Sequence, residues 1–145
     1  MKHPGAVFSR EETSPDGSWL ITYNYSEGEK SPTIIEPCVT VIATGEILFD
    51  FWRIRLNGHL DEFDAAGFRL TVSDNYQVAT VRVRVDARIK TFTLADESTG
   101  PRPLSTLRDT LFWKIDRLRE EREDGSSLLP KSPSNLLSRL KAWFG

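Results

Sequence analysis

Cysteine is almost absent from this chain, and its rarity excludes two classes of small protein. The 145 residues contain a single cysteine, Cys38, so neither an internal disulfide framework nor a cysteine-rich zinc site can form. Long apolar runs are absent too, because no stretch of about 18 apolar residues is available to span a bilayer. The opening MKHPGAVFSREETSPDG lacks the apolar segment of a secretory signal. We therefore expect a protein of the reducing, cytoplasmic compartment.

The short motifs of common catalytic sites are also missing. Neither the G-x-S-x-G turn of a serine hydrolase nor a Gly-Lys-Ser/Thr phosphate loop occurs. The chain has one SPDG turn and no internal repeat, which excludes a β-propeller, since a propeller needs at least about four blades of similar sequence. We expect no enzymatic activity and no cofactor or metal.

Charge is plentiful but unevenly distributed. The net charge of −2 combines −6 over residues 1–75 with +4 over residues 76–145. The acidic pI of about 5.7 disfavours nucleic acid as a partner, because phosphate binding calls for a dominant basic face. Two oppositely charged halves are typical of a protein that binds another protein.

Alternation of apolar and polar residues over the first hundred positions predicts about six strands. In WLITYNY, Trp19, Ile21 and Tyr23 share one face, and the SPDG turn starts the strand. In VRVRVDARIK, valines alternate with charged residues until the phase changes near Lys90, where we expect a bulge or a turn. The segment EILFDFWRIRL (46–56) is apolar on both faces, so a strand there needs cover on both.

After DESTGPRP the period changes from that of a strand to that of a helix. Leucines and an isoleucine recur at steps of three and four, which predicts an amphipathic helix over 104–122 that ends at Gly125. The apolar second face of EILFDFW is its expected seat. A second, short amphipathic helix is expected over NLLSRLKAWF near the end of the chain. The apolar positions of the first helix are Leu104, Leu107, Leu111, Ile115 and Leu118.

These patterns predict an α+β fold, with one antiparallel sheet of about six strands followed by two C-terminal amphipathic helices that pack on it. The expected organisation is a flexible N-terminus (1–13), a single domain (14–124), a linker (125–134) and a final helix (135–145). That last helix is expected to dock on the sheet, on its twin in a homodimer, on a partner or on a membrane surface.

Two stretches carry a resemblance to known proteins. SPDGSWLITYNYSEG, followed by EPCVTVIATGEILFDFW, resembles the opening of small bacterial single-domain proteins that pair an SPDG-W strand with a later ATGE-L-x-D-x-W strand. The resemblance covers roughly the first third of the chain and carries over no functional residue. Proteins of this sort are often immunity or accessory partners encoded beside toxins. The resemblance implies a non-enzymatic immunity- or antitoxin-like protein that neutralises a cognate toxin by steric and electrostatic blocking.

Two charged groups are the candidate binding residues. The acidic group would suit a basic target, such as a nucleic-acid-cleaving toxin, because carboxylates imitate substrate phosphates and steer association. The basic group follows one strand face and either contacts phosphates or an acidic partner, or simply faces solvent. The acidic group is Glu27, Glu29, Asp61, Glu62 and Asp64; the basic group is Arg82, Arg84, Arg88 and Lys90.

An alternative function is that of a small ligand- or metal-binding enzyme domain built on NGHLDEFDAAG. His59 with the nearby carboxylates of Asp61, Glu62 and Asp64 would supply metal ligands or an acid–base pair. The other interpretation of this stretch is a solvated acidic loop, because alternation along a strand does not bring all four side chains to one face.

Two further residues have a chemical and a structural interpretation. Cys38 is either a nucleophile or a buried thiol, and its apolar neighbours favour the thiol. Asp50 stands among apolar residues, so it either forms an ion pair, with Arg53, Arg55 or a helix cation, or is placed for a partner.

Overall fold

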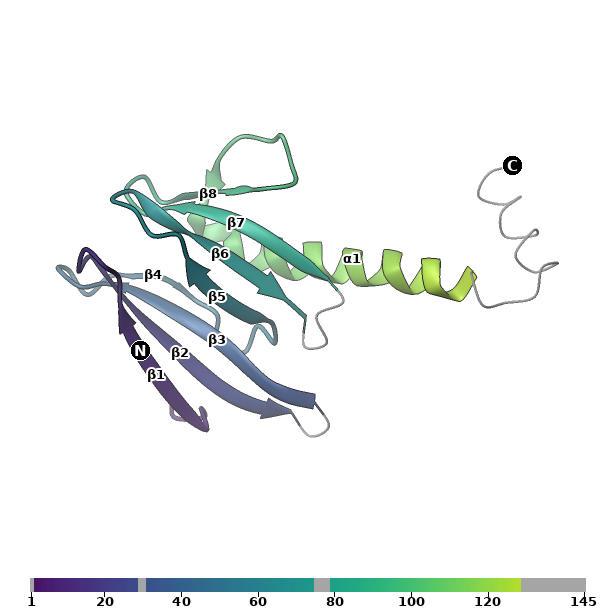
Figure 1. Cartoon of the computed structure of the whole chain (residues 1–145), viewed down its shortest axis with the longest axis horizontal. Helices are drawn as coiled ribbons and strands as arrows, with labels where there is room; N and C mark the ends of the chain where they lie inside the picture. The colour runs from purple at the N-terminus through teal and green to yellow at the C-terminus, as the bar shows by residue number, and fades with distance from the viewer. Residues whose placement is uncertain (1, 29–30, 75–78, 129–145) are drawn as a thin grey trace.

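A computed structural model describes residues 2–28, 31–74 and 79–128, in two antiparallel sheets followed by one long helix (Figure 1). Sheet A has the strand order β1-β2-β3-β4 and sheet B the order β5-β6-β7-β8-β9. The α+β class and the antiparallel pairing are confirmed, whereas the single sheet of about six strands is wrong. The strands are β1 (Phe8–Thr13), β2 (Trp19–Gly28), β3 (Ser31–Val41), β4 (Ile47–Asp50), β5 (Asn57–Asp61), β6 (Gly67–Ser73), β7 (Thr80–Asp86), β8 (Thr91–Leu94) and β9 (Arg102–Pro103).

The SPDG turn joins two strands of sheet A. Gly17 adopts a φ of +78°, and the Asp16 carboxylate accepts a hydrogen bond from the Ser18 N–H at 3.0 Å. The turn starts β2 at Trp19, as predicted, and it also ends β1. Residues 8–13 of the segment expected to be a flexible N-terminus (1–13) form β1. Nearly all side chains of β1 are exposed, so the strand shows no apolar alternation and is held by backbone pairing with β2.

The segment 46–56 is a short strand followed by an irregular crossing, instead of the one long strand that its pattern predicted. β4 ends at Asp50, and the chain then passes from sheet A to sheet B. Arg53 and Arg55 adopt φ values of +68° and +67°, which break the two-residue alternation. As a result Phe51, Ile54 and Leu56 are all buried in the core, while both arginines stay exposed.

Sheet B is joined by turns that the sequence indicates. The Asp64 carboxylate accepts hydrogen bonds from the N–H groups of Ala66 and Gly67, at 2.8 and 2.9 Å, in the turn between β5 and β6. The expected change of phase near Lys90 is a turn between β7 and β8, in which Lys90 has a φ of +54°.

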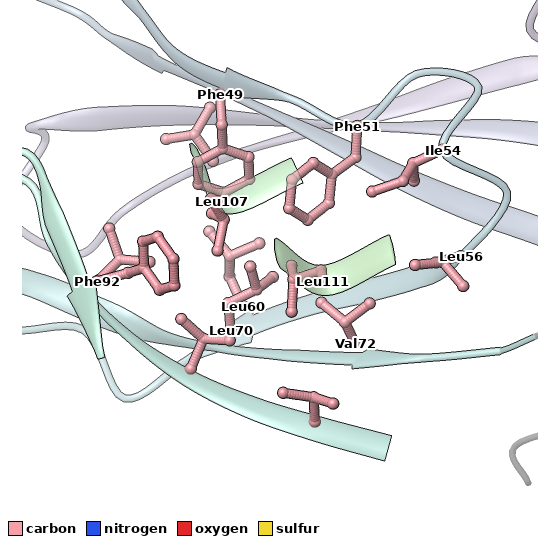
Figure 2. Close-up of a cluster of buried hydrophobic side chains, with 14 of the residues drawn as sticks. Phe49, Phe51, Ile54, Leu56, Leu60, Leu70, Val72, Phe92, Leu107 and Leu111 are labelled. Carbon is pink, nitrogen blue, oxygen red and sulfur yellow. The ribbon is translucent and has the colours of Figure 1, made fainter. Parts of the chain in front are cut away.

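Both sheets and the helix share one hydrophobic core. A 3₁₀ turn (Leu104–Thr106) leads into α1 (Leu107–Leu128). Figure 2 shows Leu107 and Leu111 of α1 between Phe49 and Phe51 on one side and the residues of sheet B, such as Leu70, on the other. The helix thus packs against EILFDFW, but on the face of Phe49 and Phe51 and not on the predicted second face, where Trp52 stacks with His3 instead.

The far end of the helix differs from the prediction. α1 continues through Gly125 to Leu128, so the part of the predicted linker (125–134) that the structure describes is helical. In Figure 1 this end of α1 extends past the strands. The predicted helix over 135–145 lies outside the described residues. Among those described, no helix is both long and apolar enough to cross a membrane.

Candidate functional site

The outer face of sheet B brings the predicted acidic and basic residues together. The register of β5, β6 and β7 places Asp61, Arg69 and Arg84 side by side across the sheet. Arg69 donates two hydrogen bonds to Asp61, at 2.9 and 3.0 Å, and lies 3.5 Å from Glu62. Arg84 donates to Asp64 at 2.6 Å. The three acidic candidates of this face are therefore engaged by arginines of the same chain.

These contacts hold the carboxylates in their charged form. Hydrogen bonds from Arg69 lower the pKa of Asp61. The hydrogen bond from Arg84, with those from the backbone of Gly67 and Ala66, lowers the pKa of Asp64 to about 2. The surface is a lattice of alternating charges and not the continuous negative patch that imitation of phosphates would need.

The remaining members of the two groups are dispersed. Lys90 donates to Glu46 at 2.8 Å, which links the β7–β8 turn to the β3–β4 turn, and Arg88 lies 4.0 Å from Asp86. Arg82 is exposed on β7. Glu27 belongs to β2, but its side chain, like the whole of Glu29, lies outside the described residues.

The His59 cluster does not converge. His59 is exposed on β5, and its ring stacks near that of Tyr23, with 6.2 Å between centroids. Asp61 and Asp64 face arginines instead of the imidazole. Over the described ranges, no three or more His, Cys, Asp or Glu side chains lie together as metal ligands would.

Cys38 and Asp50 lie opposite each other in β3 and β4. Burial, with the charge of Asp50 nearby, raises the pKa of the Cys38 thiol, which is the wrong direction for a nucleophile. Asp50 pairs with neither Arg53 nor Arg55 in the structure. It accepts a hydrogen bond from His3 Nε2 at 2.8 Å, and the His3 ring stacks on Trp52.

A groove of about 730 Å³ lies between α1 and the segment that links β8 to β9. Trp113 stands on its helix side with 67% of the residue exposed, and Phe112 beside it is 50% exposed. The two rings meet edge to face, with centroids 5.7 Å apart. Large aromatic residues that stay exposed next to a concavity are typical of interaction sites.

The helix side of the groove carries three carboxylates and two cations. Asp109, Trp113, Asp116 and Glu120 follow one another at steps of four, three and four residues, so they form a single stripe along α1. No cation of the described residues lies within 4.0 Å of these three carboxylates. Two cations of α1 also line the groove: Arg117, which lies beside the carboxylates in sequence, and Lys114, which pairs with Glu97. We call Asp109, Trp113, Asp116 and Glu120 the acidic stripe.

The opposite wall is balanced by ion pairs within the wall and with Lys114 of α1. Glu97 accepts from Arg102 at 2.9 Å and from Lys114 at 3.1 Å, and Lys114 also lies 3.3 Å from Asp96. The hydrogen bond to Glu97 raises the pKa of Lys114, so this lysine stays charged and engaged. Among the described lining residues, the charges outside these pairs are therefore those of the acidic stripe and of Arg117.

The sequence did not predict this site, because the mixed charges on the polar face of the 104–122 helix are typical of a face exposed to solvent. The available signal is the position of Trp113, which lies off the apolar positions that bury Leu107, Leu111 and Ile115. A tryptophan outside the buried stripe of an amphipathic helix is exposed, and exposure of so large an apolar side chain calls for an explanation.

Comparisons with family models, with curated proteins and with solved structures find no match to this chain.

Proposed function

We propose that this chain binds another protein and holds a basic segment of that partner in the α1 groove. The observation that carries the proposal is Trp113, 67% exposed above the groove and flanked along the helix by carboxylates. An arginine or lysine of the partner would stack on the indole face, where cation–π attraction operates. Its charge would meet Asp109 and Asp116, with charge-assisted hydrogen bonds.

The same chemistry supports the immunity- or antitoxin-like function implied by the resemblance in the sequence. A nucleic-acid-cleaving toxin needs basic side chains to hold its phosphate substrate. If the acidic stripe covered those side chains, it would block the substrate by charge and by bulk, and the opposite charges would speed the encounter. On this proposal the acidic stripe takes the part that the sequence assigned to Asp61, Glu62 and Asp64.

The test is affinity capture with the full chain, expressed in the organism that carries its gene. The unmodified chain is compared with Trp113→Ala and with the control Phe8→Ala, which removes another half-exposed aromatic, on β1. We expect one protein to co-purify in stoichiometric amount with the unmodified chain and the control. Trp113→Ala should weaken its binding by about 30-fold or more, as loss of an interface hot spot does.

A second pair of variants separates the two acidic surfaces. Asp109→Asn, Asp116→Asn and Glu120→Gln together neutralise the acidic stripe, whereas Asp61→Asn, Glu62→Gln and Asp64→Asn neutralise the outer face of sheet B. We expect the first set to slow association at low salt and the second to leave it nearly unchanged. Loss of the partner with the second set alone, or its retention by Trp113→Ala, would show that the groove is not the binding site.

A further inference from the structure

A second cavity lies on the other face of sheet A, the face turned away from the shared core. It measures about 170 Å³, and its walls come from three parts of the chain: the N-terminal segment, the centre of sheet A and the crossing from β4 to β5. It is far from the residues of the α1 groove in sequence and shares none of them. The residues that line it are Gly5, Val7, Ser26, Glu36, Trp52, Arg53 and Arg55.

Glu36 places a carboxylate at this cavity although the residue is only 1% exposed. One carboxylate oxygen accepts a hydrogen bond from the Ser26 hydroxyl at 3.2 Å, and the other accepts from the Arg55 N–H at 2.8 Å. A carboxylate has about four acceptor positions, so about two remain. Within the described residues no cation lies within 4.0 Å of it, and a buried charge without a counter-charge is costly.

The rim of the cavity carries positive charge on a strained backbone. Arg53 and Arg55 both have exposed side chains, and both adopt the left-handed conformation, at φ +68° and +67°. Neither is a glycine, and such strain is found preferentially where a chain clamps a ligand. The Arg53 guanidinium also lies 5.6 Å from the centre of the Trp52 ring, a cation–π contact that holds it at the rim.

We propose that this cavity binds a small zwitterion, an α-amino acid, independently of the protein partner. Its ammonium group would donate to the free acceptor positions of Glu36, and its carboxylate would lie against the guanidinium groups of Arg53 and Arg55. A simple cation would be repelled by the two arginines, and a simple anion by Glu36, whereas a zwitterion satisfies both. A cavity of about 150 Å³ holds benzene, so about 170 Å³ suits an amino acid with about five to eight non-hydrogen atoms.

The test uses glycine, L-alanine, L-serine and L-valine as probes on the full chain, with L-phenylalanine as the oversized control. Binding is followed by calorimetry and by the NMR shift of the Trp52 indole N–H. Glycinamide, which lacks the carboxylate, and acetate, which lacks the ammonium, complete the set. We expect a saturable shift with at least one of the four small amino acids, and affinity at least about tenfold lower for glycinamide and acetate, because each loses charged hydrogen bonds.

Two variants keep the result interpretable. Arg53→Gln alters an exposed side chain and should retain the fold while weakening binding by about tenfold or more. The control Arg88→Gln removes an exposed arginine on the β7–β8 turn and should leave affinity unchanged. No saturable shift with any small amino acid at millimolar concentration, or equal affinity for glycine and glycinamide, would overturn the proposal. Partner capture by Glu36→Gln or Arg53→Gln tests the α1 groove separately, since neither residue lines it.

Discussion

Single residues set the charge pattern of the outer face of sheet B, and Asp64 shows how. Its pKa is lowered from 3.8 to about 2, first by the hydrogen bond from Arg84 and then by the Gly67 and Ala66 N–H groups. A carboxyl group whose pKa is lower in the folded state stabilises the fold above its unfolded pKa. That contribution is present above about pH 4 and is lost as the pH falls toward 2.

We predict that Arg84→Gln raises the pKa of Asp64 toward 3.8 but not fully, because the two backbone hydrogen bonds remain. An NMR titration of the Asp64 side-chain carboxyl carbon from pH 1.5 to pH 6 measures this pKa in the variant and in the unmodified chain. Arg88→Gln, on the β7–β8 turn and not bonded to Asp64, is the control and should leave the titration unchanged. If Asp64 in the unmodified chain titrates near 3.8, the contact with Arg84 does not persist in solution.

The sequence predicts individual charged residues of the candidate sites, but it does not predict which of them lie together in the fold. The sequence places Asp61 and Arg69 in different segments, and their pairing depends on the register of β5 on β6, which no local pattern specifies. The acidic stripe is different, because its members are all in one helix. Its spacing can be computed from the sequence, but the exposure of Trp113 depends on which face of α1 the sheets cover.

Among the elements, α1 is the one whose position the sequence predicts best. Its apolar stripe must be buried, and the segment 46–56, which is apolar on both faces, needs an element to cover it. The crossing at 51–56 is the opposite case. Positive φ values are usually found at glycine or asparagine, but here they occur at Arg53 and Arg55. The alternation of residues 51–56 therefore predicts a strand, whereas the structure has an irregular crossing. β1 was missed for a related reason, since its exposed, polar side chains contain no apolar period.

The position of α1 leads to a prediction about two neighbouring residues. Leu111 is fully buried between the sheets, whereas Phe112 is 50% exposed. We expect Leu111→Ala to lower the free energy of unfolding by about 2–5 kcal/mol, because it leaves a cavity in the shared core. Phe112→Ala should change it by no more than about 0.5 kcal/mol. Urea denaturation of both variants provides the comparison.

Equal effects of the two substitutions would mean that the helix does not fill the space between the sheets. A large loss from Phe112→Ala alone would mean that α1 is rotated about its axis, with the Phe112 side inward. That rotation would also bury Trp113 and remove the basis for the α1 groove, so the pair of variants tests the orientation on which the proposed function depends.

At the scale of the whole molecule, the two sheets are joined by polar contacts as well as by the core. The Tyr23 hydroxyl accepts a hydrogen bond from the Leu60 N–H at 3.3 Å, and the Asn57 side chain accepts one from the Ile35 N–H at 2.8 Å. Gly58 lies so close to the Pro37 ring that a Cβ atom there would come within 2.7 Å of it. This close approach requires a glycine at position 58, in the strand NGHLD that borders sheet A.

The division into two sheets could not be predicted from the sequence, because every strand has a pattern that fits one sheet equally well. What separates them is the crossing between β4 and β5, and what unites them is a single cluster of buried side chains drawn from both sheets and α1. A core shared in this way makes each sheet dependent on the other, since neither buries its inner face alone.

We therefore predict that the two sheets unfold as one cooperative unit. Ile21→Ala in sheet A and Leu70→Ala in sheet B each remove a fully buried side chain and should each lower stability by about 2–5 kcal/mol. Native-state hydrogen exchange should then show the most protected amides of β2, β3, β6 and β7 losing the same free energy of protection in each variant. If Ile21→Ala lowers protection in β2 and β3 only, the sheets are separate cooperative units, and the shared core does not couple them.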